Sequence, residues 1–174
     1  GNPAVTPDGR LIVSNHPFPH GDPPEYRVVE YVDDGTVRPF PNEAWSTPPG
    51  DDGVGIHSLI GLRADPNGIV RILDIGDAEA GHLPKLVSWD TTTGRLHRVD
   101  HVPAHATTEL SFMQDFAYDA VRNAIYVADL GLSEDPGDAG KPAVVALDLD
   151  TGRTRRVIAD HPSVLPEDGV TPVM

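Results

Sequence analysis

The chain has 174 residues, of which 39% are hydrophobic, and this is enough to bury a core, so a disordered or fibrous protein is excluded. Its 27 acidic against 13 basic residues give a net charge of −14, which disfavours nucleic acid and anionic membranes as partners. Without cysteine there is no disulfide framework and no thiolate metal site, and the frequent breakers, 18 prolines and 17 glycines, favour short strands over long helices.

One pattern occurs three times along the chain: a turn followed by a β-rich run that ends in a polar residue, at 6–15, 64–74 and 118–129. A second pattern follows each of these, an Asp-rich turn with glycine and then arginine, at 33–38, 90–95 and 148–153. The recurrence of about 57 residues indicates a repeat architecture.

Each repeat predicts four antiparallel strands. In the middle repeat these are Leu59–Ala64, Ile69–Asp74, Lys85–Asp90 and Leu96–His101, joined by hairpin turns. Four antiparallel strands per repeat are typical of a propeller blade, and an apolar run such as 142–147 suits a strand covered on both faces. A β-solenoid is the structural alternative, although its rungs are usually shorter than this period.

We therefore predict an all-β fold with three four-stranded blades, about 1–45, 56–104 and 110–162, followed by a connection at 163–174. Helices should hold less than about a fifth of the residues, against the usual third of globular proteins. Because propellers need four to eight blades, these three cannot close a ring, and we expect them to form half of a six-bladed β-propeller. The two uncovered blade faces predict either a homodimer or association with the missing half of the same propeller.

Six segments together resemble the bacterial branch of the yellow/major royal jelly protein family: 1–9, 26–30, 40–45, 83–90, 111–119 and 125–129. The resemblance covers nearly the whole chain and about half of a family member. It implies a six-bladed propeller, secreted or periplasmic, with a ligand site in its axial channel. The family includes proteins related to dopachrome conversion and others that bind biogenic amines. We therefore expect a small organic ligand, with an aromatic amine as the leading class.

The chain resembles more distantly the gluconolactonase/senescence-marker family, whose propellers hold a divalent metal on Glu, Asn and Asp. The corresponding positions here are Gly1, Ile60 and Gln114, and none supplies the carboxylate that a hard cation prefers. We expect no bound metal and no other cofactor. A propeller enzyme, either an isomerase or a lactone hydrolase, remains the alternative function, and a protein-interaction platform is the second alternative.

Two candidate ligand-binding residues, Gln114 and Asp115, lie at the head of the third innermost strand, where a propeller faces its channel. A carboxylate there can bind an amine, or act as a base if burial raises its pKa. The alternative is a structural aspartate that accepts backbone N–H bonds.

The other candidates lie after second strands. Asn15, Asp74 and Asp129 recur at equivalent places, and this recurrence favours a shared turn-stabilising role over chemistry. His16 and His20 flank a Pro-Phe-Pro loop that either lines the channel mouth or lies on the surface. The chain has no Gly-x-Ser-x-Gly elbow, no dinucleotide fingerprint and no phosphate-binding Gly-Lys-Ser/Thr motif, which disfavours serine hydrolases, NAD enzymes and nucleotidases.

Overall fold

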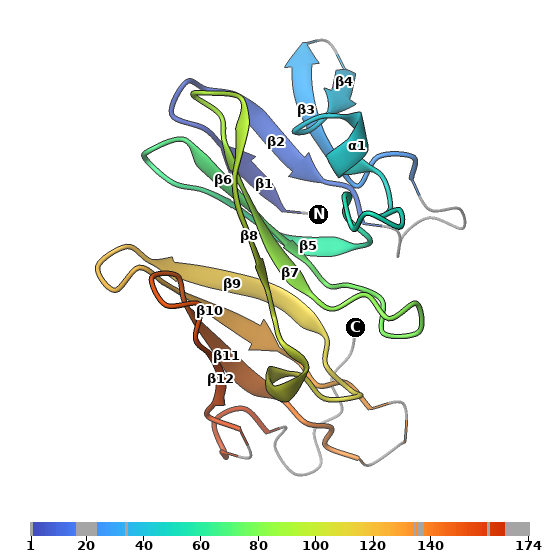
Figure 1. Cartoon of the computed structure of the whole chain (residues 1–174), viewed down its shortest axis with the longest axis vertical. Coiled ribbons are helices and arrows are strands. Elements are labelled where there is room, and N and C mark those ends of the chain that lie inside the picture. Colours follow the sequence, from blue (N-terminus) through green and yellow to red (C-terminus); the bar gives the residue numbers. More distant parts are fainter. Residues whose placement is uncertain are drawn as a thin grey trace. The chain divides into compact units, whose positions relative to one another are not determined.

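The computed structural model describes residues 2–16, 24–33, 35–133, 135, 138–159 and 161–165. The chain divides into two compact units, Gly1–His101 (unit 1) and Val102–Met174 (unit 2). Unit 1 holds two four-stranded antiparallel sheets, and unit 2 holds a third (Figure 1).

Sheet 1 consists of β1 (Pro3–Val5), β2 (Leu11–Ser14), β3 (Val28–Asp33) and β4 (Thr36–Pro39), in that spatial order. A tight turn joins β1 to β2, as the repeated turn signals predicted, and β3 pairs with β4 in an antiparallel manner. The short helix α1 (Glu43–Ser46) follows. It begins at Asn42, whose side-chain oxygen accepts the N–H of Trp45 at 3.1 Å, as an N-cap residue does.

Sheet 2 consists of β5 (Leu59–Ala64), β6 (Ile69–Asp74), β7 (Lys85–Asp90) and β8 (Arg95–His101). The first three strands have the predicted bounds, and the fourth starts one residue earlier than predicted. The shift accompanies an irregularity in register between Ser88 and Trp89 on β7, which adds a residue to β8.

The core of unit 1 lies between its two sheets. The alternation of strand side chains puts Ile12 and Val28 on one face of sheet 1, and both are completely buried. They share one apolar cluster with Leu62, Ile72 and Val87 of sheet 2. Burial of such side chains contributes roughly 1.5–3 kcal/mol each, so this packing is the main force that holds the two sheets together.

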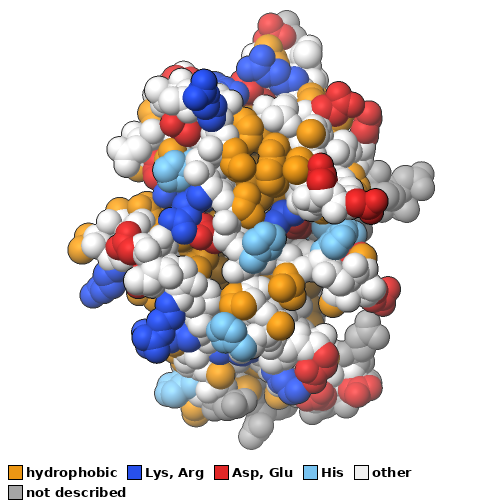
Figure 2. All heavy atoms as spheres, viewed as in Figure 1, with side chains coloured by type: hydrophobic (Ala, Val, Ile, Leu, Met, Phe, Trp, Pro, Cys, Tyr) orange, Lys and Arg blue, Asp and Glu red, His pale blue; other side chains and the backbone are white. Residues whose placement is uncertain are grey.

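The other face of sheet 1 is apolar as well, but it is open. It carries Leu11 and Val13, both partly exposed, together with Val5, Tyr31 and Val37, which are 64%, 47% and 44% exposed. Figure 2 shows hydrophobic side chains gathered in the upper part of the view, where Figure 1 places unit 1. Both faces of sheet 1 are therefore apolar; one packs against sheet 2, and the other is partly exposed to solvent.

Unit 2 starts with a short 3-10 turn, η1 (Ala104–Ala106), and then forms sheet 3 from β9 (Met113–Asp119), β10 (Ala124–Asp129), β11 (Ala143–Asp148) and β12 (Thr154–Val157). One face of sheet 3 is apolar and buried through residues that pair across neighbouring strands, among them Phe116, Val127 and Val145.

The all-β prediction with three four-stranded blade-like sheets is thus confirmed, as is the expected scarcity of helix: α1 has four residues and η1 three, and the described residues form no other helix. No helix among the described residues is long and apolar enough to cross a membrane. Closure into a propeller stays a prediction.

Candidate functional site

Polar side chains gather in unit 1 at the end where β2 and β6 finish and β5 and β7 begin. We call this group the loop-end cluster; it comprises His16, Arg27, His57, Ser58, Asp74, Asp77, His82 and Lys85. Its members lie in the loops before and after the strands or, like Asp74 and Lys85, at the strand ends, because these segments meet at one end of an antiparallel meander.

Asp74 ties this end of sheet 2 together. Its carboxylate accepts the backbone N–H groups of His57, Ser58 and Gly76, each at a shortest distance of 3.1 Å, and it is 1% exposed. The ammonium of Lys85 lies 3.7 Å away and donates to a loop carbonyl. A carboxylate saturated in this way is a structural anchor, because a ligand could reach it only by replacing these bonds.

Asp129 has the same role in unit 2. Its carboxylate accepts the N–H groups of Phe112 at 2.7 Å and Gly131 at 3.1 Å, and it pairs with the guanidinium of Arg156. The glycine two residues after each anchor has positive φ, 77° at Gly76 and 52° at Gly131. A Cβ at Gly131 would lie 2.2 Å from the Lys141 carbonyl, so the loop needs glycine there.

The contact that Asn15 makes differs from those of Asp74 and Asp129. In sheet 1 it is the hydroxyl of Ser14 that accepts an N–H before the first strand, from Asn2 at 2.7 Å. The Asn15 amide instead donates to the Tyr26 carbonyl at 3.2 Å. The equivalence inferred from the sequence is therefore shifted by one residue in the first repeat.

His16 is buried, and its Nε2 lies 3.3 Å from the hydroxyl of Ser58. Burial lowers the pKa of His16, and the nearby Arg27 guanidinium lowers it further, so the imidazole is neutral at neutral pH. The sequence singled out His16 but not Ser58, which lies 42 positions further along the chain. His20 lies outside the described residues.

Asp77 is the carboxylate of the cluster that solvent reaches. Its side chain is 26% exposed and lies 3.4 Å from Nε2 of His57. The backbone N–H of Ala80, first of all, holds the pKa of Asp77 below its ordinary value, with smaller contributions from His57 and His82. Asp77 is consequently ionised at neutral pH and can accept a hydrogen bond from a cation.

His82 lies next to Asp77, because the two residues exchange backbone hydrogen bonds at 2.7 and 2.9 Å. Its Nδ1 is buried and has no hydrogen-bond partner among the described residues. The sequence analysis did not single out Asp77, His57 or Ser58, although one signal was present. His57 and Ser58 directly precede the predicted strand Leu59–Ala64, and Asp77 lies three residues after the predicted strand that ends at Asp74.

The remaining predicted residues, Gln114 and Asp115, lie on β9 in unit 2 and are half-buried. One carboxylate oxygen of Asp115 accepts the N–H of Phe116 at 2.8 Å. They belong to unit 2, whereas the loop-end cluster belongs to unit 1.

The absence of a bound metal and the family resemblance stay predictions. Gly1 lies outside the described residues, and the described part of the chain has no group of three or more His, Asp or Glu side chains placed to hold a metal ion. No protein-family model matches the chain, and neither does any curated protein sequence.

Proposed function

We propose that this chain forms half of a six-bladed β-propeller of the yellow/major royal jelly type, secreted or periplasmic, and that it binds a small organic amine. The observation that carries the proposal is the carboxylate of Asp77, which is ionised, partly exposed and 3.4 Å from Nε2 of His57, with His82 paired to Asp77 through the backbone. An ammonium group pairs with such a carboxylate through a charge-assisted hydrogen bond.

Calorimetric titration with tyramine tests this proposal. Asp77→Asn should weaken binding at least about tenfold, which corresponds to about 1.4 kcal/mol, because the amide cannot pair with the ammonium. The substitution spares the local fold, since the remaining side-chain oxygen can still accept the N–H groups of Glu79 and Ala80.

Asp90→Asn is the matched control. Asp90 accepts the N–H groups two and three residues ahead, as Asp77 does, but it lies at a hairpin turn between β7 and β8. Its substitution should leave tyramine binding unchanged. The proposal is wrong if the uncharged analogue p-cresol binds as tightly as tyramine, or if both variants bind tyramine as tightly as the original protein.

A second candidate function is a lactone hydrolase or isomerase of the same architecture. It is favoured by the neutral imidazole of His16 beside the Ser58 hydroxyl, because this pairs a base with a group that it can deprotonate. Turnover of a lactone that Ser58→Ala abolishes would support this candidate over simple binding.

A further inference from the structure

An arginine occupies the same place in the fourth strand of all three sheets. These arginines are Arg38, Arg98 and Arg155, and each pairs with a residue of the neighbouring third strand. That residue pairs in turn with a residue of the second strand, the third one after the turn that joins the first two strands. The rows across the sheets are Ala4–Ile12–Glu30–Arg38, Arg63–Arg71–Ser88–Arg98 and Ala117–Tyr126–Ala146–Arg155.

In the two sheets of unit 1 this arginine has a carboxylate within its own sheet. Arg38 forms a two-pronged pair with Glu30, its neighbour in the row, with N–O distances of 2.9 and 3.0 Å. Arg98 pairs with Asp100 two residues further along the same strand. In sheets 1 and 2 the positive charge of this arginine is therefore neutralised by a carboxylate of the same sheet.

Sheet 3 lacks that carboxylate. The residue at the place of Glu30 is Ala146, and no hydrogen bond or ion pair is found between the Arg155 side chain and any other described residue. A hollow of about 220 Å³ lies over Ala146. Its lining is Arg122, Ala124, Tyr126, Ala146, Leu147, Asp148, Arg153 and Arg155.

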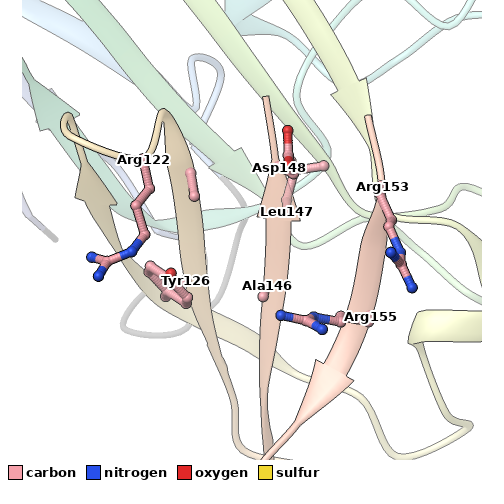
Figure 3. A pocket seen from close by; sticks show the side chains of 8 residues that line it. Arg122, Tyr126, Ala146, Leu147, Asp148, Arg153 and Arg155 are labelled. Carbon is pink, nitrogen blue, oxygen red and sulfur yellow. The ribbon is translucent and has the colours of Figure 1, made fainter. Parts of the chain in front are cut away.

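Figure 3 shows the Arg155 side chain reaching across towards Ala146, with Arg122 beside the ring of Tyr126 on the other side. Two of the three guanidinium groups have local acids: Arg122 pairs with Asp119 at 2.8 Å, and Arg153 lies near enough to Asp148 to lower its pKa, after the larger effect of the Thr151 N–H. The hollow is thus lined by three guanidinium groups, and two of them have a nearby carboxylate, Asp119 or Asp148. The positive charge of Arg155 is not balanced by a carboxylate of the described residues.

We infer that this hollow binds a small aromatic carboxylate. Its carboxylate would take the place that the Glu30 carboxylate has in sheet 1, facing the planar fork of Arg155, and its ring would lie against Tyr126 over the floor of alanine side chains. A single negative charge matches this unbalanced positive charge, and the volume is below that of pockets for drug-sized ligands, typically about 300–1,000 Å³, so the ligand is of benzoate size. This site is distinct from the amine site proposed at Asp77.

The test is a titration with sodium benzoate, followed by two-dimensional NMR of the backbone amides. Shifts should concentrate on β10, β11 and β12, and the neutral analogue benzamide should bind at least tenfold more weakly. Arg155→Gln should weaken benzoate binding at least tenfold while tyramine binding at the other site is unchanged.

A second pair of variants controls for misfolding. Ala146→Glu puts a carboxylate where sheet 1 has one, so it should raise the midpoint of thermal unfolding and abolish benzoate binding. Ala146→Gln fills the same space without charge and should give no such rise. Equal binding of benzoate and benzamide, or unchanged benzoate binding in Arg155→Gln, would overturn the inference. Self-association that Arg155→Gln abolishes, without benzoate binding, would assign the hollow to a protein carboxylate and overturn it as well.

Discussion

Glu30 is the residue whose electrostatics depend most on the fold. It is buried between the guanidinium groups of Arg10 and Arg38, and its hydrogen bonds to them, Arg10 first, hold its pKa at about 2 instead of 4.5. A carboxyl whose pKa falls on folding stabilises the native state above its unfolded pKa, and this contribution is lost as the pH falls through the folded value.

The Glu30→Gln variant should therefore be less stable than the original protein by up to about 3 kcal/mol at pH 7. Urea unfolding at several pH values measures this difference. The difference should persist down to about pH 5, shrink between pH 4.5 and 2 and vanish below that range. A difference that does not change over the whole range would show that the ion pairs contribute nothing.

The strands were more predictable from the sequence than the residues of the site. The turn signals and alternating apolar residues gave correct bounds for β5, β6 and β7, because both depend only on neighbouring residues. The anchoring roles of Asp74 and Asp129 followed from their recurrence.

Contacts between distant segments could not be predicted in the same way. His57 and Asp77, or His16 and Ser58, meet only after the strands between them have paired, and no local pattern encodes those distances. The one-residue shift at Ser14 and Asn15 was not predictable for a related reason: the place of these residues relative to the strand end depends on the register of β1 with β2.

An aspartate that anchors the end of a sheet should contribute more to the free energy of unfolding than an aspartate in an exposed turn. Asp129→Asn removes the charge that neutralises Arg156, whose side chain is 14% exposed, and it puts an amide NH2 donor in place of the oxygen that accepts from Arg156 and from the Ser111 hydroxyl. We expect a loss of about 3 kcal/mol in the free energy of unfolding.

Asp148→Asn is the control for this prediction. Asp148 also accepts two backbone N–H groups, but in an exposed hairpin turn, so the loss should stay below about 1 kcal/mol. Chemical denaturation measures both values, and equal losses would contradict the assignment of Asp129 as an anchor.

At the scale of the whole molecule, the open apolar face of sheet 1 predicts association with a second copy. Burial of apolar surface stabilises a protein by about 25 cal/mol per Å². Val5 and Tyr31 are about half exposed or more, so a second copy that covers them would gain this free energy. Light scattering should show a concentration-dependent dimer, and the double variant Val5→Glu/Tyr31→Glu should shift it to monomer.

Val121→Glu is the control, because Val121 is 94% exposed on a hairpin turn and should play no part in association. A monomer at micromolar concentration with a cooperative thermal transition would refute the expectation.

The carboxylate of Asp74 has a consequence for how the loop-end cluster meets a ligand. It fixes the backbone of His57 and Ser58 on one loop and of Gly76 on the next, so the segments that carry the candidate side chains are ordered before any ligand arrives. A ligand at Asp77 then has little backbone conformational entropy to remove, and the binding energy is not spent on arranging the site. Such a preorganised site selects its ligand by fit, and it should bind without a change of backbone conformation.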